Sequence, residues 1–224
     1  MFKSVICRWS GIAGLAALLA GCFDLNQSLI VKDSGEADFN FAFTLDAALL
    51  ELSDEADIDA ESTCDSDDVW NDLPAGLTRV SDVRIEGSQL VCEYTISGPL
   101  PKFEQLSADL ERENHRAEVI SLKLLDDHRA QISSVYNFSD QELDFDSDES
   151  PMAKSIKRMI AANFEGHFIR WAIHAPAILE SNGEISPDGK TVTWAVPLEE
   201  AIMAGGEFRF EAVIDYRNEK VQFF

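Results

Sequence analysis

The side chains with the clearest chemistry in this sequence are its four thiols, which belong to Cys7, Cys22, Cys64 and Cys92. Cys22 follows Leu19-Ala20-Gly21 at the end of an apolar run over residues 9–20, and Lys3 and Arg8 precede that run. A basic start, an apolar core and small residues before a cleavage point are typical of a secretory signal. The run is shorter than the roughly 20 residues that span a bilayer. We therefore predict that residues 1–21 are an export signal.

Leu19-Ala20-Gly21-Cys22 resembles the lipobox of bacterial lipoproteins at all four positions. The resemblance implies that Cys22 becomes the mature N-terminus, with lipid on its sulfur and its amine. The alternative is an ordinary signal peptide with an incidental cysteine. Phe23, rather than Asp, follows the cysteine. By resemblance to Gram-negative lipoproteins, that residue implies export to the outer membrane, where the protein faces the periplasm.

Cys64 and Cys92 remain once the signal is removed and Cys22 is lipidated. An even number of remaining cysteines in an oxidising compartment predicts a disulfide. A metal site or a redox pair is the less favoured reading, because the chain contains no CxxC pattern and no histidine near either residue.

The chain is strongly acidic, with a formal net charge of −23, and loss of Lys3 and Arg8 with the signal makes it more acidic. Nucleic-acid binding depends on Lys and Arg that neutralise phosphates, so this function is excluded. Anionic headgroups also repel such a domain unless divalent ions intervene. The acidity provides solubility or a recognition surface for a basic protein partner.

We find no motif for catalysis, a cofactor or a metal. The run from Asp144 through Asp146 to Asp148 matches the first three ligands of an EF-hand loop. The sixth position of that loop requires Gly and holds Glu149, while the twelfth requires Glu and holds Ser155. We therefore predict a protein that is not an enzyme and has no dedicated metal site.

Alternation of apolar and polar residues predicts strands, most of them arranged as successive hairpins. The expected strands are 29–32 with 37–45, 78–85 with 90–96, 117–125 with 130–138, and then 166–174, 191–196 and 208–216. Cys92 falls on the apolar face of its strand. A short helix is expected at 47–52, and acidic loops at 53–68 and 140–149.

A long amphipathic helix is expected to begin at Ser150-Pro151, which have the chemistry of a helix start. Its apolar face contains the candidate ligand-pocket residues Met152, Ile156, Met159 and Ile160, followed by Phe164. These residues either pack in the core or line a pocket between the helix and the sheet. The predicted fold class is α+β, an antiparallel sheet packed on this one helix. A tether over 22–28 precedes a single domain over 29–224.

Three stretches together resemble the LppM-type lipoprotein domain. They are the hairpin sequence at 29–39, the segment 175–183, and the segment 188–198, which contains Val192-Thr193-Trp194. The resemblance implies a sheet curved around a long helix, somewhat like Bet v 1 folds, in an envelope protein associated with lipid or glycolipid binding. It implies no catalytic residues. We expect a lipid-anchored binding protein, or alternatively an assembly protein that holds a basic partner on its acidic surface.

Overall fold

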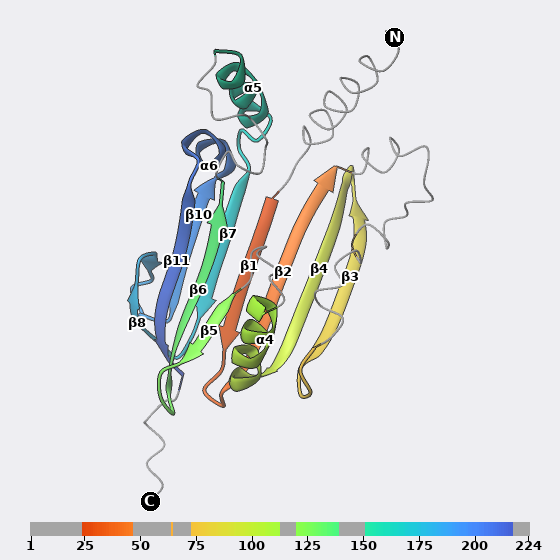
Figure 1. Cartoon of the computed structure of the whole chain (residues 1–224). Coiled ribbons are helices and arrows are strands. Elements are labelled where there is room, and N and C mark those ends of the chain that lie inside the picture. Colours follow the sequence, from red (N-terminus) through yellow and green to blue (C-terminus); the bar gives the residue numbers. More distant parts are fainter. Residues whose placement is uncertain (1–23, 47–63, 65–72, 113–119, 139–150, 217–224) are drawn as a thin grey trace, which may run out of the picture.

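The computed structural model describes residues 24–46, 64, 73–112, 120–138 and 151–216, which form two β-sheets and three helices (Figure 1). The large sheet has seven strands in the order β3-β4-β2-β1-β7-β10-β9. Their bounds are β1 Asp24–Val31, β2 Glu36–Asp46, β3 Thr78–Glu86, β4 Gln89–Pro99, β7 Phe168–His174, β9 Glu184–Ile185 and β10 Thr191–Pro197.

The second sheet has four strands in the order β5-β6-β11-β8. Their bounds are β5 Ser121–Leu124, β6 Arg129–Asn137, β8 Ala177–Ser181 and β11 Glu207–Asp215. One core cluster joins the two sheets, since Leu25 and Leu29 of the large sheet pack with Ile132 and Ile214 of the small one. The domain is therefore a mixed α+β fold with its main core between the sheets.

Every predicted strand is present in the structure. The three expected hairpins are the antiparallel pairs β1–β2, β3–β4 and β5–β6. The strands could be predicted because buried and accessible residues alternate along them. In β11, for example, the buried residues are Phe210, Ala212 and Ile214, and the residues between them are accessible.

The first strand corrects two expectations. β1 begins at Asp24, so residues 24–28 belong to the sheet and not to a tether. The buried residues of this part of β1 are Leu25, Gln27 and Leu29. Because Gln27 and the residues beside it are polar, the sequence here does not show the alternation of apolar and polar residues that predicts a strand. β1 also pairs in parallel with β7. The sheet is therefore not purely antiparallel, because a strand from the start of the domain is inserted beside one from its last third.

The expectation of one long helix packed across the sheet is wrong. The described chain has α4 (Leu100–Arg112), α5 (Pro151–Ala162) and α6 (Leu198–Ala204). α5 begins where predicted, but it packs mainly against the short α6 beyond the ends of the strands (Figure 1). α4 covers the core instead, through Leu100, Phe103 and Leu106. The likeness to Bet v 1 folds stays a prediction.

Two of these helices, which the sequence analysis does not predict, begin with residues that favour a helix start. Pro101 stands in the first turn of α4, a position where proline is favoured. Glu199 and Glu200 stand in the first turn of α6, where the helix dipole stabilises acids. The expected helix at 47–52 and the acidic loops lie outside the described residues, apart from Cys64. None of the described helices is long and apolar enough to cross a bilayer.

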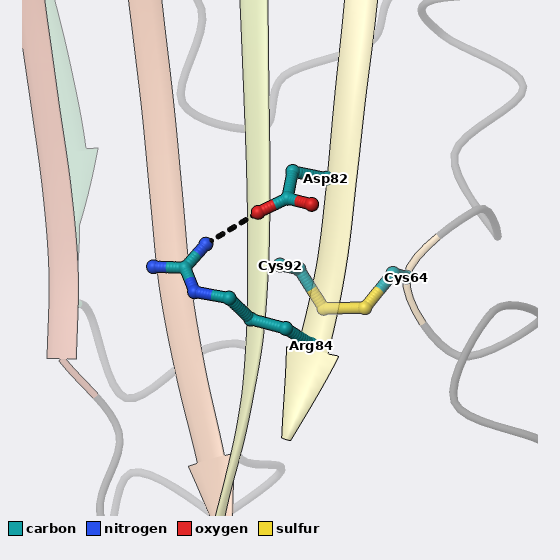
Figure 2. The surroundings of a disulfide bond; sticks show 4 residues. All are labelled: Cys64, Asp82, Arg84 and Cys92. Carbon is teal, nitrogen blue, oxygen red and sulfur yellow. Dashed lines mark hydrogen bonds and ion pairs between the residues drawn. A yellow bond between two sulfur atoms is a disulfide. The ribbon is translucent and has the colours of Figure 1, made fainter. Parts of the chain in front are cut away.

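The predicted disulfide between Cys64 and Cys92 is present, with 5.6 Å between the two Cα atoms (Figure 2). Both cysteines are buried, and Cys92 lies on the core face of β4 as its alternation predicted. They pack with Leu90 and Tyr94 in a second apolar cluster, separate from the main core. The bridge therefore fastens Cys64 to the β2–β4–β3 half of the large sheet.

Reduction of this bridge should lower the free energy of unfolding by about 3–4 kcal/mol, because the reduced unfolded chain regains the entropy of an open loop. Urea denaturation of the mature Cys22→Ser chain, with and without reductant, measures the difference. The Cys64→Ala/Cys92→Ala variant is the control, and its midpoint should not respond to reductant. Equal stability of the oxidised and reduced chains would contradict the prediction.

Candidate functional site

A row of large side chains crosses the core face of the large sheet at one level. The strand registers place Tyr94 opposite Phe41, Phe41 opposite Gln27, Gln27 opposite Trp171, and Trp171 opposite Trp194. The row thus runs over β4, β2, β1, β7 and β10. Its centre is a polar amide, whereas all four of its other members are aromatic.

Gln27 is the unusual member, because only 3% of its surface is exposed. The indole N–H of Trp171 donates a hydrogen bond to Gln27 Oε1. An indole nitrogen can only donate, so this bond fixes which end of the amide is the oxygen. Gln27 Nε2 is then a buried donor, and it has no acceptor within the described part of the chain. Buried polar groups in native proteins are usually satisfied by a protein atom, an ordered water or a ligand.

Beside this amide, three rings form a cluster that we call the inner-face cluster, made of Phe41, Phe43 and Tyr94. The ring centroids are 5.9 Å apart for Phe41–Phe43, 6.1 Å for Phe41–Tyr94 and 6.4 Å for Phe43–Tyr94. Phe41 and Phe43 are only partly buried. The guanidinium of Arg79 lies over the Tyr94 ring, 4.7 Å from its centroid. The cluster thus offers apolar surface, with an amide donor beside it.

The structure does not bring the predicted pocket residues of α5 together in this way. Met159 is 56% exposed, and Ile156 is partly buried. Ile160 packs against the edge of the main core, and the side chain of Met152 lies outside the described residues. α5 packs mainly against α6, and of the three members with described side chains only Ile160 reaches the main core.

A hollow of about 290 Å³ lies on the small sheet, where β8 pairs with β11. Glu180 and Glu211 contribute the charges of its lining, together with the neutral Gln131 and Asn182. Asn182 Oδ1 accepts hydrogen bonds from Trp194 Nε1 at 2.9 Å and from the Glu211 amide at 3.0 Å. The hollow is therefore polar and acidic, which does not suit an apolar chain.

An acidic cluster surrounds the guanidinium of Arg84 on the face of β3 and β4 opposite to Cys92, and Figure 2 shows its Asp82–Arg84 pair. Arg84 Nη1 donates to Asp82 and to Glu93, at 2.7 Å in each case, and Arg84 Nε donates to Glu86 at 2.5 Å. The hydrogen bonds that Arg84 donates lower the pKa of Glu93, and the acceptance of such bonds by the three carboxylates raises the pKa of Arg84. Three carboxylates share one cation, so this cluster, the Arg84 cluster, keeps a net negative charge.

Asp24 fixes the start of β1 beside the start of β7. Its Oδ1 accepts a hydrogen bond from the Phe168 amide at 3.0 Å and lies 3.2 Å from Arg170 Nη1. His167 Nδ1 is 3.6 Å from Asp24 Oδ2. The described residues contain no group of three or more His, Cys, Asp or Glu side chains arranged to bind a metal. The EF-hand-like run, His115 and Cys22 lie outside them.

No protein-family model matches the chain, and no curated protein matches it. Among known structures, the chain is similar to the NMR structure of the folded domain of LppM from Mycobacterium tuberculosis. The TM-score is 0.48 at 10% identity, and the match covers 91% of this chain and 95% of that domain. It is also similar to a homology model of the full-length AP-3 complex, with a TM-score of 0.26 and 9% identity. That match covers 90% of this chain but only 51% of the AP-3 chain.

The replacement Gln27→Leu should lower the free energy of unfolding by about 1–3 kcal/mol, because it leaves the buried Trp171 N–H without an acceptor. Chemical denaturation measures the loss. The same replacement made in a Trp171→Phe background is the matched control and should cost much less, since no donor is orphaned there. Equal costs in the two backgrounds would show that the Gln27–Trp171 bond does not stabilise the fold.

Proposed function

We propose that the mature chain is a lipid-anchored, non-catalytic lipoprotein of the cell envelope whose domain binds an amphiphile, either a lipid or a glycolipid. The lipobox-like Leu19–Cys22 pattern supports the anchor. The observation that supports the ligand is the inner-face cluster, where partly exposed rings adjoin the unsatisfied amide of Gln27. The proposed location is the outer membrane, with the domain in the periplasm.

The two parts of an amphiphile match the two parts of this site. An alkyl chain that covers Phe41 and Phe43 would remove their remaining apolar surface from water, at about 25 cal/mol per Å². A hydroxyl, carboxyl or ester oxygen would accept the hydrogen bond that Gln27 Nε2 lacks in the described structure. Satisfying a buried donor regains about 1–3 kcal/mol.

The anchor also defines which end of the domain meets the membrane. Cys22 stands two residues before Asp24, and two residues span at most about 7 Å. Asp24 is bonded to the start of β7, at the end of the large sheet where α5 and α6 lie (Figure 1). The lipid on Cys22 would therefore hold this end of the domain toward the bilayer.

A second candidate function is the capture of a basic protein partner by the acidic surface. The Arg84 cluster favours this function, because the three negative charges of Asp82, Glu86 and Glu93 outnumber the single positive charge of Arg84. Salt separates the two functions. Attraction between exposed charges fades as the screening length falls to about 3 Å at 1 M salt, whereas burial of an alkyl chain does not.

A brominated fatty acid should quench the tryptophan fluorescence of the Cys22→Ser domain, because its bromine would lie near the row that contains Trp171. We expect Phe43→Ala to weaken this binding about tenfold, through loss of roughly 1.4 kcal/mol of apolar contact. Met159→Ala on the exposed face of α5 is the control and should leave binding unchanged. Melting temperatures of both variants test that they are folded.

The opposite pattern, with weaker binding in Met159→Ala and normal binding in Phe43→Ala, would move the site back to the apolar face of α5. If the brominated fatty acid quenches the tryptophan fluorescence of neither the parent chain nor the variants, the amphiphile proposal is wrong.

A fluorophore on Met159→Cys in the lipidated protein should be quenched by brominated lipids in vesicles, because α5 lies at the anchored end. Leu125→Cys is the matched control, since Leu125 is also exposed and lies in the β5–β6 turn at the opposite end. Eight residues of β1 separate the two ends by about 23 Å. Equal quenching of the two labels would contradict this orientation.

A further inference from the structure

β3 is the long exposed edge of the large sheet. It pairs with β4 over all nine of its residues without a register shift, and it has no strand on its other side within the described chain. Val80 is 67% exposed and Ile85 is 58% exposed. Soluble proteins usually shorten, bend, charge or cover such an edge, because its free N–H and C=O groups pair with strands of other chains.

The other described sheet edges are blocked in these ways. α4 covers β5, since Ser107 Oγ accepts from the Leu122 amide at 3.0 Å and Glu104 accepts from the Leu124 amide at 2.9 Å. β9 is two residues long. β8 has a register shift against β11, and its Ile178 amide is bonded to the Gly189 carbonyl. β3 is nine residues long, has no register shift against β4, contains no proline and is covered by none of the described helices, so its protection consists of its charged side chains.

The register indicates which backbone groups of β3 face outward. Glu86 pairs with Gln89 across the two-residue turn Gly87-Ser88, and such a turn closes on a hydrogen-bonded pair. In an antiparallel ladder hydrogen-bonded and non-bonded pairs alternate, so Ser81, Val83 and Ile85 are non-bonded toward β4. Their N–H and C=O groups therefore point to the open side of β3.

The charges on β3 specify the chemistry of a strand that would pair there. The side chains of Asp82, Arg84 and Glu86 share one face of the sheet, because they alternate along the strand. With Glu93 of β4 they form the Arg84 cluster, in which three carboxylates meet one guanidinium. A neighbouring strand with Lys or Arg on that face would supply the missing positive charge. On the opposite face, Val83 and Ile85 favour apolar residues.

We propose that β3 is a docking edge for an extended segment of another protein, which adds to the sheet as a strand with basic residues on one face and apolar residues on the other. Backbone hydrogen bonds would provide the affinity and the side chains the specificity. A second copy of this chain is a poor occupant, because it would bring two negative clusters together on molecules of high negative charge. The proposal deepens the second candidate function and depends neither on the amphiphile nor on the lipid of Cys22.

Binding of a capped peptide of alternating lysine and valine to the mature Cys22→Ser chain tests this proposal at low salt. The control peptide has the same composition, with lysines and valines in separate blocks, so its charge is equal. We expect the alternating peptide to bind at least about tenfold more tightly, since only it can present lysines to one face and valines to the other.

The decisive protein variant is Ser81→Pro, because proline is tolerated at an edge position whose N–H faces solvent and removes only that outward donor. We expect this variant to bind the alternating peptide about five- to tenfold more weakly, because one backbone hydrogen bond to the peptide is lost. Its melting temperature should not change. Ser81→Thr is the matched control and should bind normally. Asp82→Lys/Glu86→Lys should abolish binding by reversing the charge of the cluster.

Other outcomes overturn the proposal in different ways. If the two peptides bind equally and Ser81→Pro has no effect, but Asp82→Lys/Glu86→Lys abolishes binding, the acidic surface attracts basic chains without strand addition. That result leaves the second candidate function intact and removes the docking edge. If sedimentation shows a dimer of the parent chain that Ser81→Pro dissociates, the occupant is a second copy. If the alternating peptide does not bind at all, β3 is not a docking site for a basic strand.

Discussion

The insertion of β1 between β2 and β7 is the constraint on which the rest of this structure depends. Antiparallel pairing joins β1 to the hairpin strands that follow it, and parallel pairing joins it to a strand about 144 residues later in the chain. The seven strands form one sheet only because β1 bridges these two groups. The same insertion sets the end of the large sheet at which the described chain begins, aligns Gln27 with Trp171, and leaves β3 at the outer edge.

Local sequence patterns were sufficient for most of the strands and for the disulfide. β2 and β4 alternate apolar and polar residues over long stretches, so their faces could be assigned from the sequence, including the burial of Cys92. α4 was missed although Pro101 and its apolar spacing indicate a helix. The start of β1 was missed for a physical reason, since Gln27 is a polar residue at a core position. The residues around Gln27 in the sequence give no indication that its hydrogen-bond partner is the indole of Trp171.

The candidate site could not be predicted for the same reason. The sequence placed a ligand on the apolar face of α5, because a helix with Met159 and Ile160 on one side resembles the wall of a pocket. Whether such a face lines a cavity depends on what packs against it, and in the structure α5 packs mainly against α6. The candidate site depends on registers between strands, which set Tyr94 beside Phe41, Phe41 beside Gln27, and Gln27 beside Trp171. Those pairings are properties of the whole sheet.

Native mass spectrometry of the mature Cys22→Ser chain, purified from a bacterial periplasm, shows directly whether the domain holds an amphiphile. We expect a fraction of the chain to retain a discrete added mass of lipid size, and Phe43→Ala to reduce this fraction. A chain that has formed its Cys64–Cys92 bridge but is entirely free of added mass, in the parent and in the variant alike, would contradict an amphiphile-binding role.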